Sequence, residues 1–192
     1  MTIVRPDLVA SPTEGNAMRR SYRFAGLIAL GLTVLIAAGP RLSESSRESV
    51  QLTVVTYDQL VEAVKQHRGK IVLVDVWFEQ CVPCKIGFPK LLALHRKYRD
   101  QGLVAITVNV DDPADTATKQ KIVNFLQSSQ ATCINLQVSE SPDIWSKLGI
   151  KSVPSVFMFD REGRMLRKWT DGVDYGQIAT RVAAEISTTE PK

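Results

Sequence analysis

Two cysteines separated by two residues, Cys81 and Cys84, are the side chains best placed to do chemistry. They follow an apolar run at residues 70–76 and precede leucines at helical spacing, so we expect them at the N-terminal end of a helix. Backbone N–H groups and the helix dipole stabilise negative charge there, which lowers the pKa of the first thiol. We expect Cys81 to stand exposed at the helix tip, where it can attack as a thiolate, and Cys84 to lie one turn further in, where it can resolve the mixed disulfide. Pro83 suits the first helical turn, where its missing N–H costs no hydrogen bond.

Three other uses of such a pair are possible. Structural zinc needs four ligands, and the sequence adds only Cys133, His67 and His95, without a second paired motif. Covalent haem needs a histidine directly after the second cysteine, where this chain has Lys85. A purely structural disulfide would restrict the unfolded chain little, because the loop it closes is short. The pattern therefore favours thiol–disulfide exchange, without a metal or another cofactor.

The composition is that of a globular domain with additional segments. Of 192 residues, 44% are hydrophobic and 23% are charged, which is enough for one domain with its own core. Half of the net charge of +4 lies outside residues 50–192, and a domain so nearly neutral has no electrostatic footprint for nucleic acid. Three cysteines are too few for a disulfide-braced scaffold. We expect Cys133 to be buried as a small hydrophobic residue.

The N-terminal part of the chain predicts a membrane anchor or an export signal. Arginines at positions 19, 20 and 23 precede an uncharged apolar run at residues 24–40. Such a basic flank places residues 1–23 in the cytoplasm and the rest of the chain outside it. The length of the run favours an uncleaved single-pass anchor, and secretion after signal cleavage is the alternative. A buried core helix would not explain the basic flank.

Residues 41–49 form a polar, Ser-rich linker, and residues 50–192 form one domain in which strands and helices alternate. Residues 70–76 are aliphatic except for Asp75, which predicts a central strand buried on both faces. Thr56 and Gln59 have the spacing of a capping box that opens a helix. A mixed sheet flanked by helices is therefore expected. The other predicted strands are 50–55, 104–110, 133–138, 155–160 and 165–170, and the other helices are 84–101, 115–130, 143–148 and 175–186.

The residues around the cysteines resemble those of the thioredoxin superfamily, and most closely its membrane-anchored, extracytoplasmic TlpA/ResA-type oxidoreductases. Trp77 lies four residues before Cys81, as in the W-x-x-x-C-x-x-C signature of the family. Pro89 stands where the active-site helix kinks, and residues 153–155 look like the cis-proline loop. Residues 111–140 are similar to the helix–strand insertion of the TlpA/ResA group. The resemblance covers about residues 50–187 and implies an α/β thioredoxin fold with that insertion.

The resemblance also implies roles for single residues. Cys81 matches the nucleophile and Cys84 the resolving thiol, and together they would form the redox disulfide. Asp75 matches the buried acid of the family. A carboxylate on a buried strand should have a raised pKa, and it could then accept a proton from Cys84 during resolution. The alternative for Asp75 is a polar group that is merely hydrogen-bonded at the end of a strand.

Pro154 matches the cis-proline that faces the disulfide and shapes the substrate groove. A cis bond before proline is uncommon and is usually retained for a purpose. A plain trans-proline before a strand is the alternative. The residues expected to line the groove beside Pro154 are Trp77, Val82, Pro83 and Val153.

Four positions near the sulfur atoms depart from the family pattern. Gln80 stands where tryptophan is common, Phe78 where small residues are usual, and Val82 where many members have glycine or proline. Gly87 stands where the TlpA/ResA group often has glutamate. A glycine inside a helix costs about 1 kcal/mol relative to alanine, so Gly87 indicates close packing or a local bend. These departures bear on the redox potential and on the choice of partner.

The predicted function is exchange of dithiols and disulfides with protein cysteines on the extracytoplasmic side of a membrane, as a reductase. Electrons would come from a membrane thiol donor, and by analogy the substrates include apocytochrome c cysteines or misoxidised envelope proteins. The direction of transfer depends on the reduction potential, so an oxidase or isomerase is an alternative. A second alternative is a thioredoxin-fold adaptor that binds partners without redox turnover. It remains possible because residues 78–80 differ from the family pattern.

Overall fold

The computed structural model describes residues 50–140 and 143–188. The predicted strands and helices are all present, with ends within three residues of the predicted ones. The predicted N-terminal segment, apolar run and linker fall outside the described residues. Among the residues that are described, no helix is both long and apolar enough to cross a membrane.

In chain order the elements are β1 (Thr53–Val55), α1 (Tyr57–Lys65), β2 (Ile71–Trp77), α2 (Val82–Tyr98), the 3-10 turn η1 (Arg99–Gln101), β3 (Leu103–Asn109), α3 (Thr116–Ser128), β4 (Ile134–Val138), α4 (Ile144–Lys147), β5 (Ser155–Phe159), β6 (Met165–Trp169) and α5 (Tyr175–Ser187).

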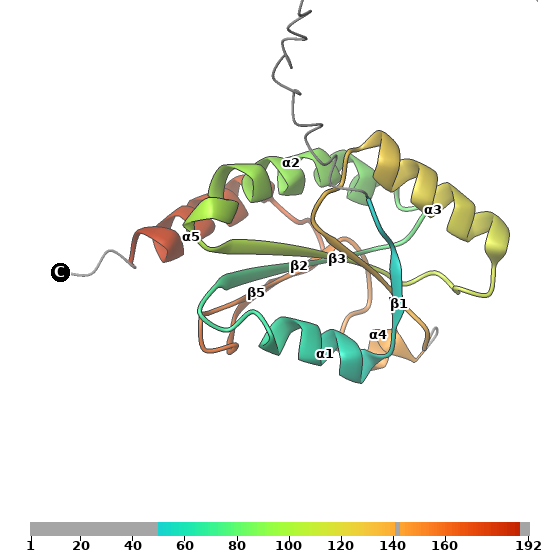
Figure 1. Ribbon diagram of the computed structural model, residues 1–192, viewed down its shortest axis with the longest axis horizontal. Coiled ribbons are helices and arrows are strands. Elements are labelled where there is room, and N and C mark those ends of the chain that lie inside the picture. The colour runs from blue at the N-terminus through green and yellow to red at the C-terminus, as the bar shows by residue number, and fades with distance from the viewer. Residues whose placement is uncertain (1–49, 141–142, 189–192) are drawn as a thin grey trace, which may run out of the picture. The chain divides into compact units, whose positions relative to one another are not determined.

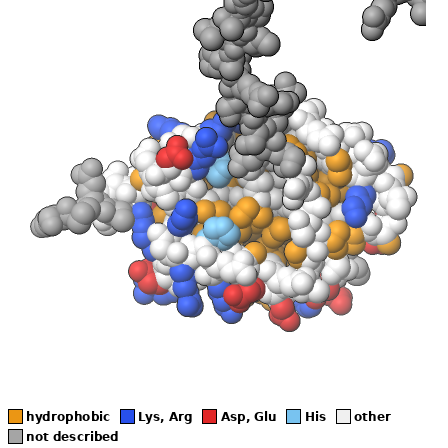
Figure 2. All heavy atoms as spheres, in the orientation of Figure 1, with side chains coloured by type: hydrophobic (Ala, Val, Ile, Leu, Met, Phe, Trp, Pro, Cys, Tyr) orange, Lys and Arg blue, Asp and Glu red, His pale blue; other side chains and the backbone are white. Residues whose placement is uncertain are grey.

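A six-stranded mixed sheet lies between two layers of helices, as Figure 1 shows. The strand order is β1–β4–β3–β2–β5–β6. The first four strands of this order run parallel to one another, whereas β5 is antiparallel to both β2 and β6. Helices α2, α3 and α5 cover one face, and α1 and α4 cover the other. The outer surface in this view carries acidic, basic and hydrophobic side chains side by side (Figure 2).

Strand β2 is central because all of its residues except Asp75 are hydrophobic. All seven of its side chains are buried, and the strand pairs with β3 on one side and β5 on the other. Leu73 and Trp77 pack with α2 and α5 in one hydrophobic cluster, whereas Val74 and Val76 pack with α1 in a second cluster. The alternation of side chains along a strand therefore places Asp75 on the α2 and α5 face.

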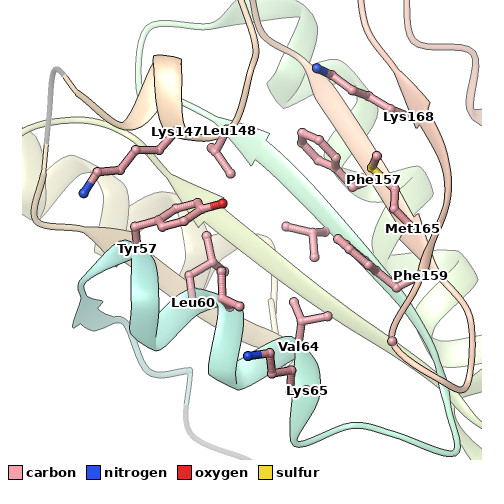
Figure 3. Close-up of a pocket in the computed structure, with 13 residues that line it drawn as sticks. Tyr57, Leu60, Val64, Lys65, Lys147, Leu148, Phe157, Phe159, Met165 and Lys168 are labelled. Carbon is pink, nitrogen blue, oxygen red and sulfur yellow. The ribbon is translucent and has the colours of Figure 1, made fainter.

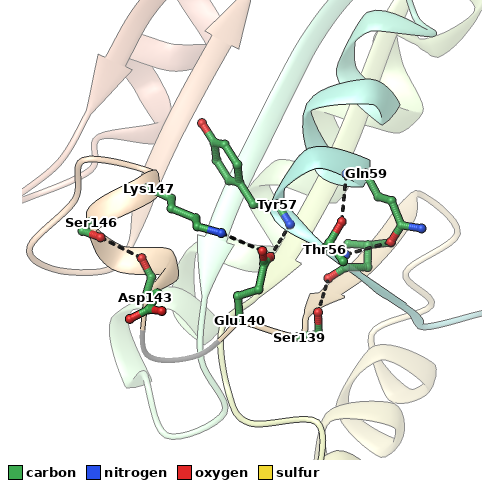
Figure 4. Close-up of polar contacts among 9 residues, drawn as sticks. Thr56, Tyr57, Gln59, Ser139, Glu140, Asp143, Ser146 and Lys147 are labelled. Carbon is green, nitrogen blue, oxygen red and sulfur yellow. Dashed lines mark hydrogen bonds and ion pairs between the residues drawn. The ribbon is translucent and has the colours of Figure 1, made fainter.

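The start of α1 is fixed by the predicted capping box, which is present. The Thr56 hydroxyl accepts from the Gln59 N–H at 3.2 Å, and the Gln59 side chain accepts from the Thr56 N–H at 2.8 Å (Figure 4). Glu140 accepts the N–H of Tyr57 and pairs with Lys147 at 2.7 Å, which joins α1 to α4. The hydrogen bond from Lys147 and that from Tyr57 hold the pKa of the Glu140 carboxyl below its usual value.

A cavity of about 340 Å³ opens on the α1 face, between α1, α4 and the β5–β6 hairpin (Figure 3). Apolar side chains such as Leu60 and Phe157 form much of its lining, and Lys65, Lys147 and Lys168 add positive charge. The cavity lies on the opposite side of the sheet from the cluster that contains the two cysteines. It is therefore separate from the site described below.

Candidate active site at the start of helix α2

Cys81 and Cys84 are joined by a disulfide, and their Cα atoms lie 5.3 Å apart. Helix α2 begins at Val82 rather than at Cys84 as predicted, because Cys81 is its N-cap residue. The Cys81 Sγ atom accepts the N–H of Cys84 at 3.2 Å, which satisfies one of the free N–H groups of the first turn. Pro83 lies in that turn, where a proline is expected. The first sulfur atom thus lies where N–H groups can stabilise a thiolate.

The Cys81 side chain is only 4% exposed, which corrects the expectation of an open thiol at the helix tip. Cys81 belongs to the same hydrophobic cluster as Cys84 (1% exposed) and Trp77. Phe78 and Val153 are half-buried and pack against this cluster. The family resemblance leads one to expect small residues at position 78, and the larger phenylalanine there adds apolar bulk beside the disulfide.

The loop that leads into Cys81 is held by Asp111, which follows β3. One carboxylate oxygen of Asp111 accepts the N–H of Glu79 at 2.6 Å and the side-chain amide of Asn109 at 2.8 Å. Glu79 also pairs with Lys85 of α2 at 2.7 Å. These contacts connect the loop both to the segment that follows β3 and to helix α2.

Trp77 does not form the surface of a groove, as had been expected, because it is 1% exposed. Its ring packs against Phe88 of α2 and Phe125 of α3, with centroids 5.5 Å and 5.3 Å away. The two phenylalanines also touch each other, with centroids 5.0 Å apart. Helices α2 and α3 bury this large ring, which lies on an inward-facing position of β2. Trp77 is therefore part of the core beneath the site and does not line its surface.

The Val153–Pro154 peptide bond is cis, as the loop resemblance predicts. Ser155 pairs with Val76 in the antiparallel β2–β5 ladder, so Pro154 lies next to the end of β2, at the edge where the loop to Cys81 begins. Val153 and Pro154 are half-buried. Val82, on the first turn of α2, is 66% exposed. Of the residues predicted to line a groove, all but Trp77 therefore reach the surface.

Asp75 is 1% exposed and lies in the middle of the sheet. Its Oδ2 atom accepts a hydrogen bond from the Tyr175 hydroxyl at 2.6 Å, and its Oδ1 atom is buried with no hydrogen-bond partner among the described residues. Burial raises the pKa of Asp75 to about 7, and the hydrogen bond from Tyr175 lowers it in part. The predicted rise is confirmed, and its cause is desolvation of the charged form.

Gly87 is closely packed, as the cost of a helical glycine suggested. A Cβ atom at this position would lie 2.3 Å from Cε2 of Tyr175 and 3.0 Å from its hydroxyl oxygen. Tyr175 is the first residue of α5, and its ring occupies the space beside Gly87, three residues after Cys84. The same side chain therefore contacts the helix with the resolving cysteine and the strand with the buried acid.

Cys133 is buried, as predicted, with 9% of its surface exposed. Its thiol donates to Asn135 at 3.5 Å, and Asn135 is held by three backbone carbonyl groups. Burial, with a smaller contribution from the nearby charge of Asp75, raises the pKa of Cys133 to about 12. Within the described parts of the chain, no group of three or more His, Cys, Asp or Glu side chains could hold a metal ion.

Two residues of the site were not found from the sequence, Tyr175 and Asp111. Tyr175 had been assigned only as the start of the last helix, and Asp111 only as part of a turn. Gly87 was the signal for Tyr175, since a helical glycine implies that something lies close to it. A carboxylate that follows a strand carries no comparable signal, so Asp111 could be recognised only from its contact with the Glu79 N–H.

Comparison with known proteins bears on this site. Residues 69–165 match the family model described as thioredoxin-like. The thiol-disulfide oxidoreductase ResA of Halalkalibacterium halodurans is 23% identical over 158 residues, which cover 81% of this chain and 86% of that protein. ResA of Bacillus thuringiensis subsp. konkukian is 23% identical over 125 residues, 65% of this chain and 69% of that one. A solved thiol:disulfide interchange protein of the thioredoxin family from Chlorobium tepidum has a TM-score of 0.52 at 15% identity, over 63% of this chain and 83% of that one.

Proposed function

Because this chain belongs to the thioredoxin-like family, has its fold and is a thiol–disulfide oxidoreductase, we propose that it works as a reductase of protein disulfides outside the cytoplasm. The observation that carries the proposal is the Cys81–Cys84 disulfide at the start of α2, with the Cys84 N–H directed at the Cys81 sulfur atom. A sulfur atom in this position is stabilised as a thiolate, which is the form that attacks a disulfide.

In the proposed reaction the reduced pair transfers two electrons to a substrate disulfide. The Cys81 thiolate attacks one substrate sulfur atom, the substrate S–S bond breaks, and the other substrate sulfur leaves as a thiolate that takes a proton from water. Cys84 then gives its proton to the Asp75 carboxylate and attacks the Cys81 sulfur atom. The mixed disulfide breaks, the Cys81–Cys84 disulfide forms, and the second substrate thiolate is released.

Asp75 suits the role of proton acceptor because its pKa lies close to neutral pH. With a pKa raised to about 7, the carboxylate is available to accept a proton and basic enough to hold it. Asp75 belongs to the same face of the sheet as Cys84, and Tyr175 bridges the two elements that carry them. We therefore assign Asp75 as the general base of the resolving step.

Substrate binding is assigned to the surface around Val82, Pro83, Val153 and Pro154. Val82 and Ile86, both 66% exposed, offer apolar area on the first two turns of α2. A cysteine-containing segment in extended conformation would lie between this area and the cis-proline loop. Attack at Cys81 requires a wider opening than the oxidised structure has, because Cys81 is only 4% exposed.

The N-terminal sequence supports the proposed location. The basic flank and the apolar run at residues 24–40 support a single-pass anchor, or a cleaved signal, with the domain on the extracytoplasmic side. A domain in that position would be re-reduced by a thiol donor in the membrane. Its substrates would be protein disulfides of the same compartment, with apocytochrome c cysteines as one class.

Two measurements test the proposal. With dithiothreitol as donor, the wild-type chain should reduce insulin disulfides, and Cys81→Ser should abolish the activity. Cys133→Ser is the matched control and should retain it, because Cys133 takes no part in the Cys81–Cys84 disulfide. A reduction potential below that of the glutathione pool would support a reductase, and one well above it would identify an oxidase or isomerase instead.

A non-catalytic adaptor is the second candidate, and the 4% exposure of Cys81 is the observation that favours it. An adaptor would keep the disulfide closed and use the same surface only to bind partners. It predicts that wild type and Cys81→Ser are equally inactive toward insulin but bind the same partner proteins.

A further inference from the structure

Tyr175 of α5 contacts two elements of the active site, β2 and α2, at residues that precede it by 88 positions or more. Its hydroxyl donates to Asp75 at 2.6 Å, and its ring occupies the space above Gly87, three residues after Cys84. The ring is itself buried, with 6% of the residue exposed. A side chain of any size at position 87 would displace the ring, so the glycine on α2 and the tyrosine on α5 are matched to each other.

The hydrogen bond is made to one oxygen of the carboxylate and leaves the other free. Oδ2 accepts from Tyr175, while Oδ1 is buried with no partner among the described residues. An unpaired buried acceptor is costly and is often retained for a chemical purpose. Here it is the oxygen that remains able to take a proton.

We propose that Tyr175 is a positioning residue, which holds the Asp75 carboxylate by Oδ2 and leaves Oδ1 as the acceptor for the Cys84 proton. This inference rests on the proposed exchange reaction. Tyr175 touches neither substrate nor sulfur in the proposal; it acts through Asp75. The contact also sets the pH at which the resolving step works, since a hydrogen bond to the charged form stabilises the carboxylate.

Among the described residues, several other titratable groups lie on this face of the sheet. Tyr98, Cys133 and, once the disulfide is reduced, Cys81 and Cys84 belong to the same cluster or pack against it, and the half-buried His95 lies on α2. Neither cysteine of the pair titrates in the oxidised protein, and Cys133 titrates far above neutral pH. The titration is therefore read at the carboxyl carbon of Asp75 itself, which separates it from that of any other group.

The test is Tyr175→Phe, which keeps the ring over Gly87 and removes only the hydroxyl. The pKa of Asp75, measured from its carboxyl carbon by NMR on the oxidised full chain, should rise by about one unit, because a hydrogen bond to a charged group contributes that much. Resolution of a preformed mixed disulfide on Cys81 should slow by about fivefold at pH 7, because the ionised fraction of Asp75 falls from about one half to about one tenth, and it should recover about one pH unit higher. Tyr57→Phe, on the opposite face of the sheet, should change neither measurement.

An unchanged Asp75 titration in Tyr175→Phe would overturn the inference, whether or not the protein reduces disulfides. Loss of exchange activity in the wild type would overturn the proposed function instead, and the NMR titration would still be readable. If Tyr175→Phe does not fold, the inference is tested by NMR on the wild-type protein instead. The Tyr175 Cζ resonance must then follow the titration of Asp75 and must lose that transition in Asp75→Asn.

Discussion

The ring of Tyr175 stands where the side chain of residue 87 would be, so helix α2 contains a glycine because helix α5 begins with a tyrosine. The two residues are 88 positions apart, and a Cβ atom on Gly87 would lie 2.3 Å from Cε2 of the ring. That distance is far shorter than a carbon–carbon contact. Tyr175 cannot move away without losing its hydrogen bond to Asp75.

Gly87→Ala should therefore destabilise the protein, although glycine to alanine in a helix normally stabilises by about 1 kcal/mol. Overpacking of this kind costs about 1–3 kcal/mol, and urea unfolding of the oxidised protein would measure it. The matched control is Ala93→Gly at an exposed position of the same helix, which should cost about 1 kcal/mol from helix propensity alone. A Gly87→Ala protein more stable than the wild type would contradict the packing described here.

Asp75→Asn should make the protein more stable at neutral pH. The pKa of Asp75 is raised from 3.8 to about 7 in the folded state, so the folded protein holds a proton that the unfolded chain releases between those values. Stability contributed by this group is thus present below about pH 4 and is lost as the pH rises toward 7. The loss is at most about 4 kcal/mol. Urea unfolding at several pH values should show the advantage of Asp75→Asn growing from pH 4 to 7; an advantage independent of pH would refute this account.

Reduced protein should be alkylated at Cys81 well before Cys133. A thiol whose pKa is about 12 is ionised to only about one part in 10⁵ at pH 7, whereas the start of a helix favours the thiolate of Cys81. Brief iodoacetamide treatment at pH 7 followed by peptide mass spectrometry measures the order of reaction. Equal labelling of the two residues in folded protein would contradict the raised pKa of Cys133, and labelling in urea provides the reference in which both react.

Cys84→Ser should accumulate a mixed disulfide between Cys81 and a substrate protein, because the resolving sulfur atom is missing. Non-reducing gel electrophoresis of cell envelopes would reveal adducts that disappear on reduction. Cys81→Ser is the matched control and should trap little, since Cys84 is the more deeply buried sulfur atom. Adducts of equal abundance in both variants would show that Cys81 is not the attacking residue.

Asp111→Ala should loosen the loop that leads into Cys81. The substitution removes the acceptor for the Glu79 N–H, which then becomes free to exchange with solvent. A hydrogen bond to a charged group contributes about 1.5–3 kcal/mol, so exchange of the Glu79 amide should accelerate at least tenfold. Asp112→Ala is the control, because among the described residues that carboxylate accepts only from the nearby Ala114 N–H. Equal exchange rates at the Glu79 amide in both variants would show that Asp111 does not hold this loop.

Local sequence was enough to determine most of the fold. The apolar run of β2, the capping box at Thr56 and the alternation of strands and helices depend on residues near one another, and all three are present in the structure. The disulfide at the start of α2 likewise depends on a four-residue spacing. The raised pKa of Asp75 followed from one carboxylate in a buried strand.

Only the tertiary structure decided which distant segments are in contact and how exposed individual residues are as a result. Tyr175 reaches Asp75 from 100 residues away, and Asp111 reaches Glu79 from 32 residues away, separations at which no periodic pattern reports a contact. The low exposure of Cys81 and Trp77 depends on how α2 and α3 pack over β2. Sequence periodicity states which face of an element is buried, whereas the side chain that fills a given space depends on the packing of all elements at once.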